Sequence, residues 1–166
     1  MTRSRVSIAI TALLWLLVLA TSAQIFCFSS EDSKKSGETS AKFVRTVAKV
    51  AVPAYKKMTP KEKASFVKSV MNTVRKVAHF TIFAILGLWL WFLISRYRKN
   101  FILPLAVGIS ALYACTDELH QTFVSGRSGQ IKDVLIDTSG AIAGALTAFI
   151  LFLIWQKLKN KVTKRQ

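Results

Sequence analysis

Apolar residues gather in four long runs, which polar and basic segments separate. The runs cover residues 6–28, 77–94, 101–115 and 134–155. A helix needs about 20 apolar residues to cross the hydrocarbon core of a bilayer. The segment between the second and third runs, residues 96–100, is too short for anything but a tight antiparallel turn. We therefore predict an all-α membrane protein whose four transmembrane helices form an antiparallel bundle.

The first run has a second interpretation. Small residues at Thr21, Ser22 and Ala23 resemble the cleavage site of a secretory signal peptide. The run continues beyond them to Phe28, which is long for the apolar part of a signal peptide. On this length criterion we expect an uncleaved first helix.

The connection after the first run is polar at first and amphipathic later. Residues 28–40 are rich in serine and lack a hydrophobic period, so we expect a loop there. In residues 41–52, basic side chains share one helical face and apolar ones share another. This pattern predicts a basic amphipathic helix on the bilayer surface that ends at Pro53. A solvated charged linker is the alternative, because the segment is short.

A second helix start follows at Thr59. Thr59 can cap the helix, Pro60 suits the first helical position, and Glu62 completes a capping box. Because nothing downstream breaks a helix, we expect it to continue into the second apolar run. The predicted parts are thus a tail and first helix at 1–28, a basic extramembrane connection at 29–76, a three-helix membrane core at 77–156 and a basic tail at 157–166.

Composition supports a membrane protein with anionic partners. The 166-residue chain is 52% hydrophobic and has a formal net charge of +16. On a chain with long apolar runs, this charge indicates anionic lipid headgroups and topology signals rather than nucleic acid, for which no recognition motif is present. Cys27 and Cys115 lie within apolar runs without metal-ligand spacing, so we expect buried free thiols rather than a disulfide, and no metal or cofactor.

Ionisable residues cluster where the predicted spans begin and end. In an antiparallel bundle, the start of the second span, the end of the third and the start of the fourth lie on one side of the membrane. Ionisable groups at membrane depth are costly and indicate a functional site. The predicted site residues are Arg75, Lys76, His79, Asp117, Glu118, Gln121, Arg127, Asp133 and Asp137. Gly87, Gly140 and Gly144 are predicted to allow close packing of helices.

The orientation in the membrane follows from the charged flanks. Ten basic residues lie on the side of the termini and fourteen on the other side. The flanks of the first helix usually dominate orientation, and here Arg3 and Arg5 precede it while Glu31 and Asp32 follow it. We therefore expect both termini in the cytoplasm of a multi-pass cell-membrane protein, with the polar site at the outer leaflet.

The motifs resemble those of the VanZ-like family of bacterial membrane proteins. The resemblance rests on Ser29-Ser30, on Arg75-Lys76-x-Ala78-His79-Phe80, on Asp117-Glu118-x-x-Gln121-x-Phe123 with Gly126-Arg127, and on Asp133-Val134 with Asp137 and Gly140. It implies a Gram-positive-type envelope and a role in resistance to the glycopeptide teicoplanin or in envelope stress tolerance. It implies no established reaction. Within this pattern His120 is interpreted as a filler position.

Four hypotheses account for the cluster. The first is recognition of an anionic lipid, a lipid-linked cell-wall precursor or a glycopeptide by cationic side chains. The second is catalysis on a lipid phosphate or diphosphate, with His79, Asp117 and Glu118 as candidates and with carboxylates that could hold a divalent cation. The third is proton or ion transport. In the fourth, Arg75 and Arg127 merely neutralise Asp117, Asp133 and Asp137.

Overall fold

A computed structural model describes residues 2–163 and shows an all-helical chain in that range. Four of its helices are long and apolar enough to cross a membrane, which confirms the predicted fold class. The end of the basic tail, residues 164–166, lies outside the described residues. The elements are α1 (Thr2–Ser29), α2 (Ser33–Ala51), the 3-10 helix η1 (Pro53–Lys57), α3 (Pro60–Ser95), α4 (Ile102–Gln121) and α5 (Ile131–Thr163).

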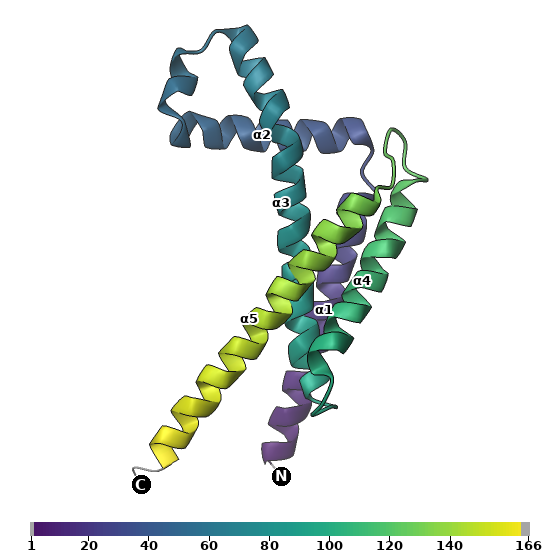
Figure 1. Cartoon of the computed structure of the whole chain (residues 1–166), viewed down its shortest axis with the longest axis vertical. Helices are drawn as coiled ribbons and strands as arrows, with labels where there is room; N and C mark the ends of the chain where they lie inside the picture. Colours follow the sequence, from purple (N-terminus) through teal and green to yellow (C-terminus); the bar gives the residue numbers. More distant parts are fainter. Residues whose placement is uncertain (1, 164–166) are drawn as a thin grey trace.

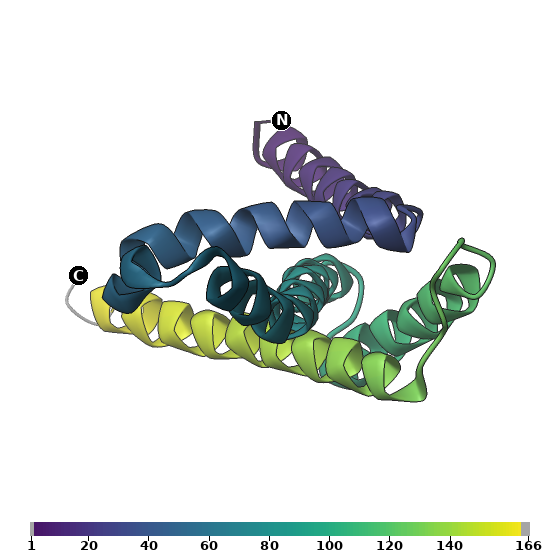
Figure 2. The same ribbon diagram turned by 90° about the horizontal axis from the view of Figure 1, so that it is seen from above.

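Helix α3 is the centre of the bundle. It contacts α1, α2, α4 and α5, and its most extensive contact is with α5. Figure 1 shows α1, α3, α4 and α5 running along the long axis of the molecule, and both described chain ends lie at the same end. Helix α2 lies across the opposite end, and the view from above shows it passing over the bundle (Figure 2). The last part of α5 diverges from the other helices (Figure 1).

The start of α2 corrects the predicted loop at residues 28–40. The helix begins at Ser33, because the Asp32 side chain accepts a hydrogen bond from the Lys35 backbone N–H at 2.7 Å and caps it. Buried Val44 and Ala48 then pack against η1 and the first turns of α3. The predicted amphipathic helix is thus present, but it starts eight residues earlier than its apolar period indicates.

The predicted capping box at the start of α3 is confirmed. The Thr59 N–H donates to Glu62 Oε2 at 2.6 Å, and the Glu62 N–H donates to Thr59 Oγ1 at 3.3 Å. Pro60 is the first helical residue, and the helix continues without a break to Ser95. This one helix therefore joins the basic connection to the membrane core.

Helices α3 and α5 approach each other closely at three glycines. A Cβ atom on Gly140 would lie 2.2 Å from the Phe80 carbonyl oxygen, and one on Gly144 would lie 1.7 Å from the Ala84 oxygen. On the other helix, a Cβ atom on Gly87 would lie 2.3 Å from the Ala141 oxygen. Only glycine leaves room for backbones at this separation.

Both cysteines differ from the prediction of buried thiols. Cys27 and Cys115 are free and exposed. They lie on outward faces of α1 and α4, where an apolar residue of a membrane helix can face lipid instead of protein. The buried core instead contains large side chains of α3, among them Phe83, Leu86 and Trp91.

A methyl group at the closest helix contact tests this packing. We expect Gly144→Ala to lower the free energy of unfolding by about 1–3 kcal/mol, because α3 and α5 must move apart. Gly108→Ala is the matched control, since a Cβ atom there meets nothing within 4 Å. Thermal unfolding of the detergent-solubilised protein measures both variants. Equal midpoints for the two would contradict the close contact.

Candidate functional site

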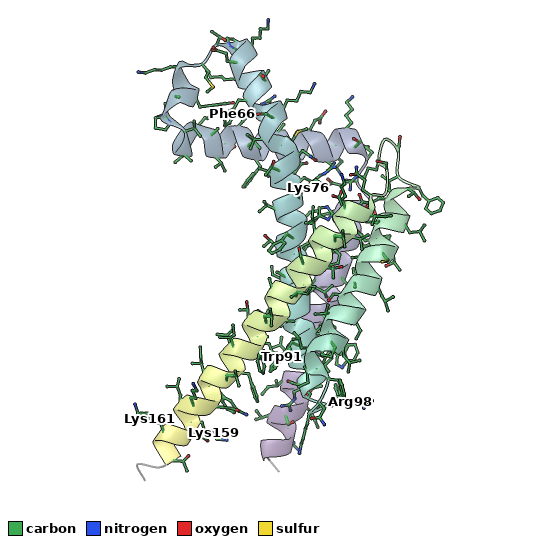
Figure 3. All side chains as sticks on the ribbon, in the orientation of Figure 1. Phe66, Lys76, Trp91, Arg98, Lys159 and Lys161 are labelled. Carbon is green, nitrogen blue, oxygen red and sulfur yellow. The ribbon has the colours of Figure 1, made fainter. Side chains whose placement is uncertain are left out.

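Polar side chains from all four long helices meet at the end of the bundle near α2. Figure 3 shows this end, where Lys76 of α3 lies beside the start of α5. Several of these side chains are buried despite their polarity, namely Ser29, Asp117, Glu118, Gln121 and Asp137. Because burial of polar groups costs free energy unless they are hydrogen-bonded, the partners of each one are informative.

Asp117 joins α4 to α1. Its Oδ2 atom accepts a hydrogen bond from Ser29 Oγ at 2.8 Å and another from Gln121 Nε2 at 3.0 Å. The predicted site did not include Ser29. The serine pair was visible in the sequence as a motif, but only the structure shows that Ser29 is completely buried against an acid of another helix.

Glu118 holds the loop between α4 and α5. Its Oε2 atom accepts a hydrogen bond from the Gln130 backbone N–H at 2.8 Å, and its Oε1 atom accepts one from Gln121 Nε2 at 3.2 Å. Gly129 lets the loop come close, since a Cβ atom there would lie 2.6 Å from the Glu118 carbonyl oxygen. Both carboxylate oxygens of Glu118 are therefore occupied by structural hydrogen bonds.

Lys76 and Asp133 form an ion pair between α3 and α5. Lys76 Nζ lies 2.6 Å from Asp133 Oδ1, and both side chains are partly exposed. The short distance indicates a charge-assisted hydrogen bond. This pair satisfies one acid and one cation of the predicted site.

Asp137 has no such partner. Its side chain is 0% exposed, and neither carboxylate oxygen accepts a hydrogen bond. The closest cationic candidate is His79, whose Nδ1 lies 3.7 Å from Asp137 Oδ2, too far for a hydrogen bond. A buried carboxylate left in this state costs several kcal/mol.

Arg127 binds the end of α1 through the terminal N–H groups of its guanidinium. Its Nη2 donates to the Phe28 carbonyl oxygen at 3.1 Å, and its Nη1 donates to Gln121 Oε1 at 3.2 Å. The Nε atom is buried and has no acceptor. Burial, together with the positive charge of nearby Arg75, lowers the pKa of Arg127, but an arginine stays charged in proteins.

Arg75, His79 and Arg127 line one groove of about 280 Å³ between α1, α2 and α3. Most of its wall is apolar, with contributions from Ile25, Phe28, Phe43, Val74 and Ile82. Glu31 also lines it but forms a 3.5 Å ion pair with Lys35. The groove thus combines a hydrocarbon-like wall with two arginine side chains.

The hypothesis of simple charge neutralisation by arginine is wrong. Within residues 5–163, no ion pair of 4 Å or less joins Arg75 or Arg127 to an acid. In that same range the Arg75 side chain also makes no hydrogen bond. The acids instead accept hydrogen bonds from Lys76, Ser29, Gln121 and a backbone N–H, because these groups lie where the helices meet.

His120 lies apart from the buried cluster. Its Nε2 is 3.1 Å from Ser30 Oγ, and its ring lies 4.8 Å from that of Phe26. These contacts fasten the ends of α1 and α4 near the surface. They assign the residue a packing role, which is compatible with its interpretation as a filler position.

Comparison with known proteins gives one match. A family model described as VanZ/LLP1 matches residues 10–154, a range that includes every site residue named above. No curated protein and no solved structure shows significant similarity to the chain.

The role of Glu118 can be tested on the loop that it holds. We expect Glu118→Gln to increase backbone hydrogen exchange in residues 122–130, because glutamine has one acceptor oxygen where Glu118 uses two, and each bond is worth about 1.5–3 kcal/mol when one group is charged. Asp133→Asn is the control, since the Asp133 side chain bonds Lys76 and not this loop. Unchanged exchange in Glu118→Gln, measured by mass spectrometry in detergent, would rule out the anchoring role.

Proposed function

Since the chain belongs to the VanZ/LLP1 family, we propose that this protein is a membrane protein that binds an anionic phosphate-bearing lipid in the groove between α1, α2 and α3. The phosphate lies against Arg75 and Arg127, and the first part of an acyl chain lies along the apolar wall. One observation carries the proposal, namely that Arg75 and Arg127, which form no ion pair with an acid in the described part of the chain, both line this largely apolar groove.

The chemistry of the two arginines supports a phosphate. A guanidinium offers planar, paired donors that match the oxygens of a phosphate or carboxylate. Neither arginine is neutralised by an acid in the described part of the chain. The positive charges of Arg75 and Arg127 repel each other, so an anionic ligand between them relieves an unfavourable interaction.

The size and wall of the groove support a lipid rather than a small polar anion. Ligand pockets commonly measure about 300–1,000 Å³. A groove of about 280 Å³ therefore fits a headgroup and part of one chain, and the rest of the lipid stays in the bilayer. The exposed Phe43 of α2 lines this groove and places an aromatic ring where hydrocarbon would lie.

The basic connection supplies long-range attraction for the same ligand. Ten lysines and arginines lie between residues 33 and 70. Each basic residue near an anionic membrane surface contributes about 1 kcal/mol. The connection thus concentrates anionic lipid next to the groove.

The biological setting extends the proposal. The family resemblance supports a bacterial envelope as the setting of this proposal. There we propose that the bound lipid is an anionic phospholipid or a lipid-linked cell-wall precursor and that the outcome is tolerance of a teicoplanin-type glycopeptide. The charged flanks of α1 favour cytoplasmic termini and an outer-leaflet groove.

Removing the positive charge of Arg75 tests lipid binding. We expect Arg75→Gln to reduce retention of phosphatidylglycerol at least about tenfold, because a charge-assisted bond contributes about 1.5–3 kcal/mol. Native mass spectrometry of detergent-extracted protein measures retention. Arg98→Gln, which removes one charge at the opposite end of the bundle (Figure 3), is the matched control.

A second variant blocks the apolar part of the groove. Ala78→Trp fills a wall position with a large ring and is expected to reduce retention without changing net charge. The lipid proposal fails if Arg75→Gln and Ala78→Trp both retain as much phosphatidylglycerol as the wild type while folding normally.

A resistance assay tests the biological setting. Expressed in a susceptible Gram-positive host, the wild type is expected to raise the minimum inhibitory concentration of teicoplanin, and Arg75→Gln is expected to return it to the level of the empty vector. Arg98→Gln is expected to behave as the wild type. Full resistance in Arg75→Gln at equal membrane abundance would show that resistance does not depend on the groove.

A further inference from the structure

The unsatisfied carboxylate of Asp137 has an unexplained environment. Of the four acids in the site, Glu118 and Asp133 have donors or a cation, and Asp117 accepts two hydrogen bonds on one oxygen. Asp137 is the most deeply buried of them and has no donor on either oxygen. A native structure rarely leaves such a group without a partner unless it binds something.

We propose that His79, Asp117 and Asp137 form a binding site for one divalent cation, Zn²⁺ or Mn²⁺. The three residues each offer one ligand atom, and these atoms lie within 4.8 Å of one another. Ligand atoms about 2.1 Å from a tetrahedral ion lie about 3.4 Å apart, so binding draws the side chains together by about 1 Å or slightly more.

The hydrogen bonds around Asp117 support a ligand role. Ser29 and Gln121 both donate to its Oδ2 atom, which fixes the carboxylate and leaves Oδ1 for an ion. Outer-shell hydrogen bonds of this kind orient metal-binding carboxylates. Asp137 needs no donor of its own if its oxygens bind the cation.

Charge balance points in the same direction. In the state that binds a metal, with both carboxylates ionised and the imidazole neutral, the three side chains carry a net charge of about −2. Burial of that charge is costly, and a divalent cation cancels it. The nearby Lys76 already pairs with Asp133, and Arg127 bonds neutral oxygens, so neither supplies the missing charge.

The donor set selects the class of metal. One imidazole nitrogen with two carboxylates suits Zn²⁺ or Mn²⁺, whereas Mg²⁺ and Ca²⁺ prefer oxygen ligands alone. Three protein ligands leave a position open for water or another oxygen. His79 lines both the groove and the small pocket that Asp137 lines, so the cation would lie next to the groove in which the lipid phosphate is proposed to bind. Only this last consequence rests on the proposed function.

The site revises the expectation of no bound metal. Its ligands come from α3, α4 and α5, and no short ligand spacing in the sequence indicates them. Only the packing of α3, α4 and α5 against one another brings them together.

Metal content tests the site directly. Tag-free full-length protein is delipidated, stripped with a chelator, incubated with ZnCl₂, MnCl₂ or MgCl₂, and passed through gel filtration for elemental analysis. We expect the wild type to retain about one Zn²⁺ or Mn²⁺ per chain and to melt at a higher temperature with it. Loss of a ligand in His79→Gln or Asp137→Asn is expected to weaken binding by more than the about 10- to 100-fold known for outer-shell changes.

Asp133→Asn is the matched control, because Asp133 lies one turn away on the same helix and outside the cluster. It is expected to retain the ion. The site is refuted if the stripped wild type retains neither Zn²⁺ nor Mn²⁺, or if Asp133→Asn loses as much metal as His79→Gln. Because the protein is delipidated, a failure here leaves lipid retention to be judged separately. If Asp137→Asn does not fold, the wild type and His79→Gln decide the question.

Discussion

The backbone contact between α3 and α5 is the constraint on which the site depends. Gly140 and Gly144 bring the second helix onto the carbonyl groups of Phe80 and Ala84. Asp137 lies one turn before Gly140, and His79 directly precedes Phe80, so the same contact places their side chains together. A larger residue at either glycine would separate the helices and open the site to its surroundings.

Some polar residues of the site stabilise the fold through hydrogen bonds or an ion pair, and others have no partner and are available to a ligand. Glu118 fastens the loop after α4, Ser29 fastens α1, and Lys76 neutralises Asp133. Arg127 Nε and both oxygens of Asp137 remain buried without partners. Two buried groups of opposite charge therefore lack hydrogen-bond partners, an arrangement that favours binding over stability.

Much of the fold follows from local patterns in the sequence. The apolar runs, the capping box at Thr59 and the glycine face of α5 all act within one helix, so their spacing predicts them. The start of α2 was missed because its first turns are polar and depend on the Asp32 cap. Burial of Ser29, exposure of both cysteines and the choice of Lys76 over the arginines depend on which helix faces meet. Spacing within one helix cannot show that.

An experimental structure in nanodiscs containing phosphatidylglycerol tests the central claim most directly. It should show a phosphate bonded to Arg75 and Arg127, with an acyl chain along the apolar wall that includes Ile25 and Phe43. An empty groove in which both guanidinium groups instead bond Asp117 or Asp137 would contradict the account, because those charges would then serve only to hold the helices together.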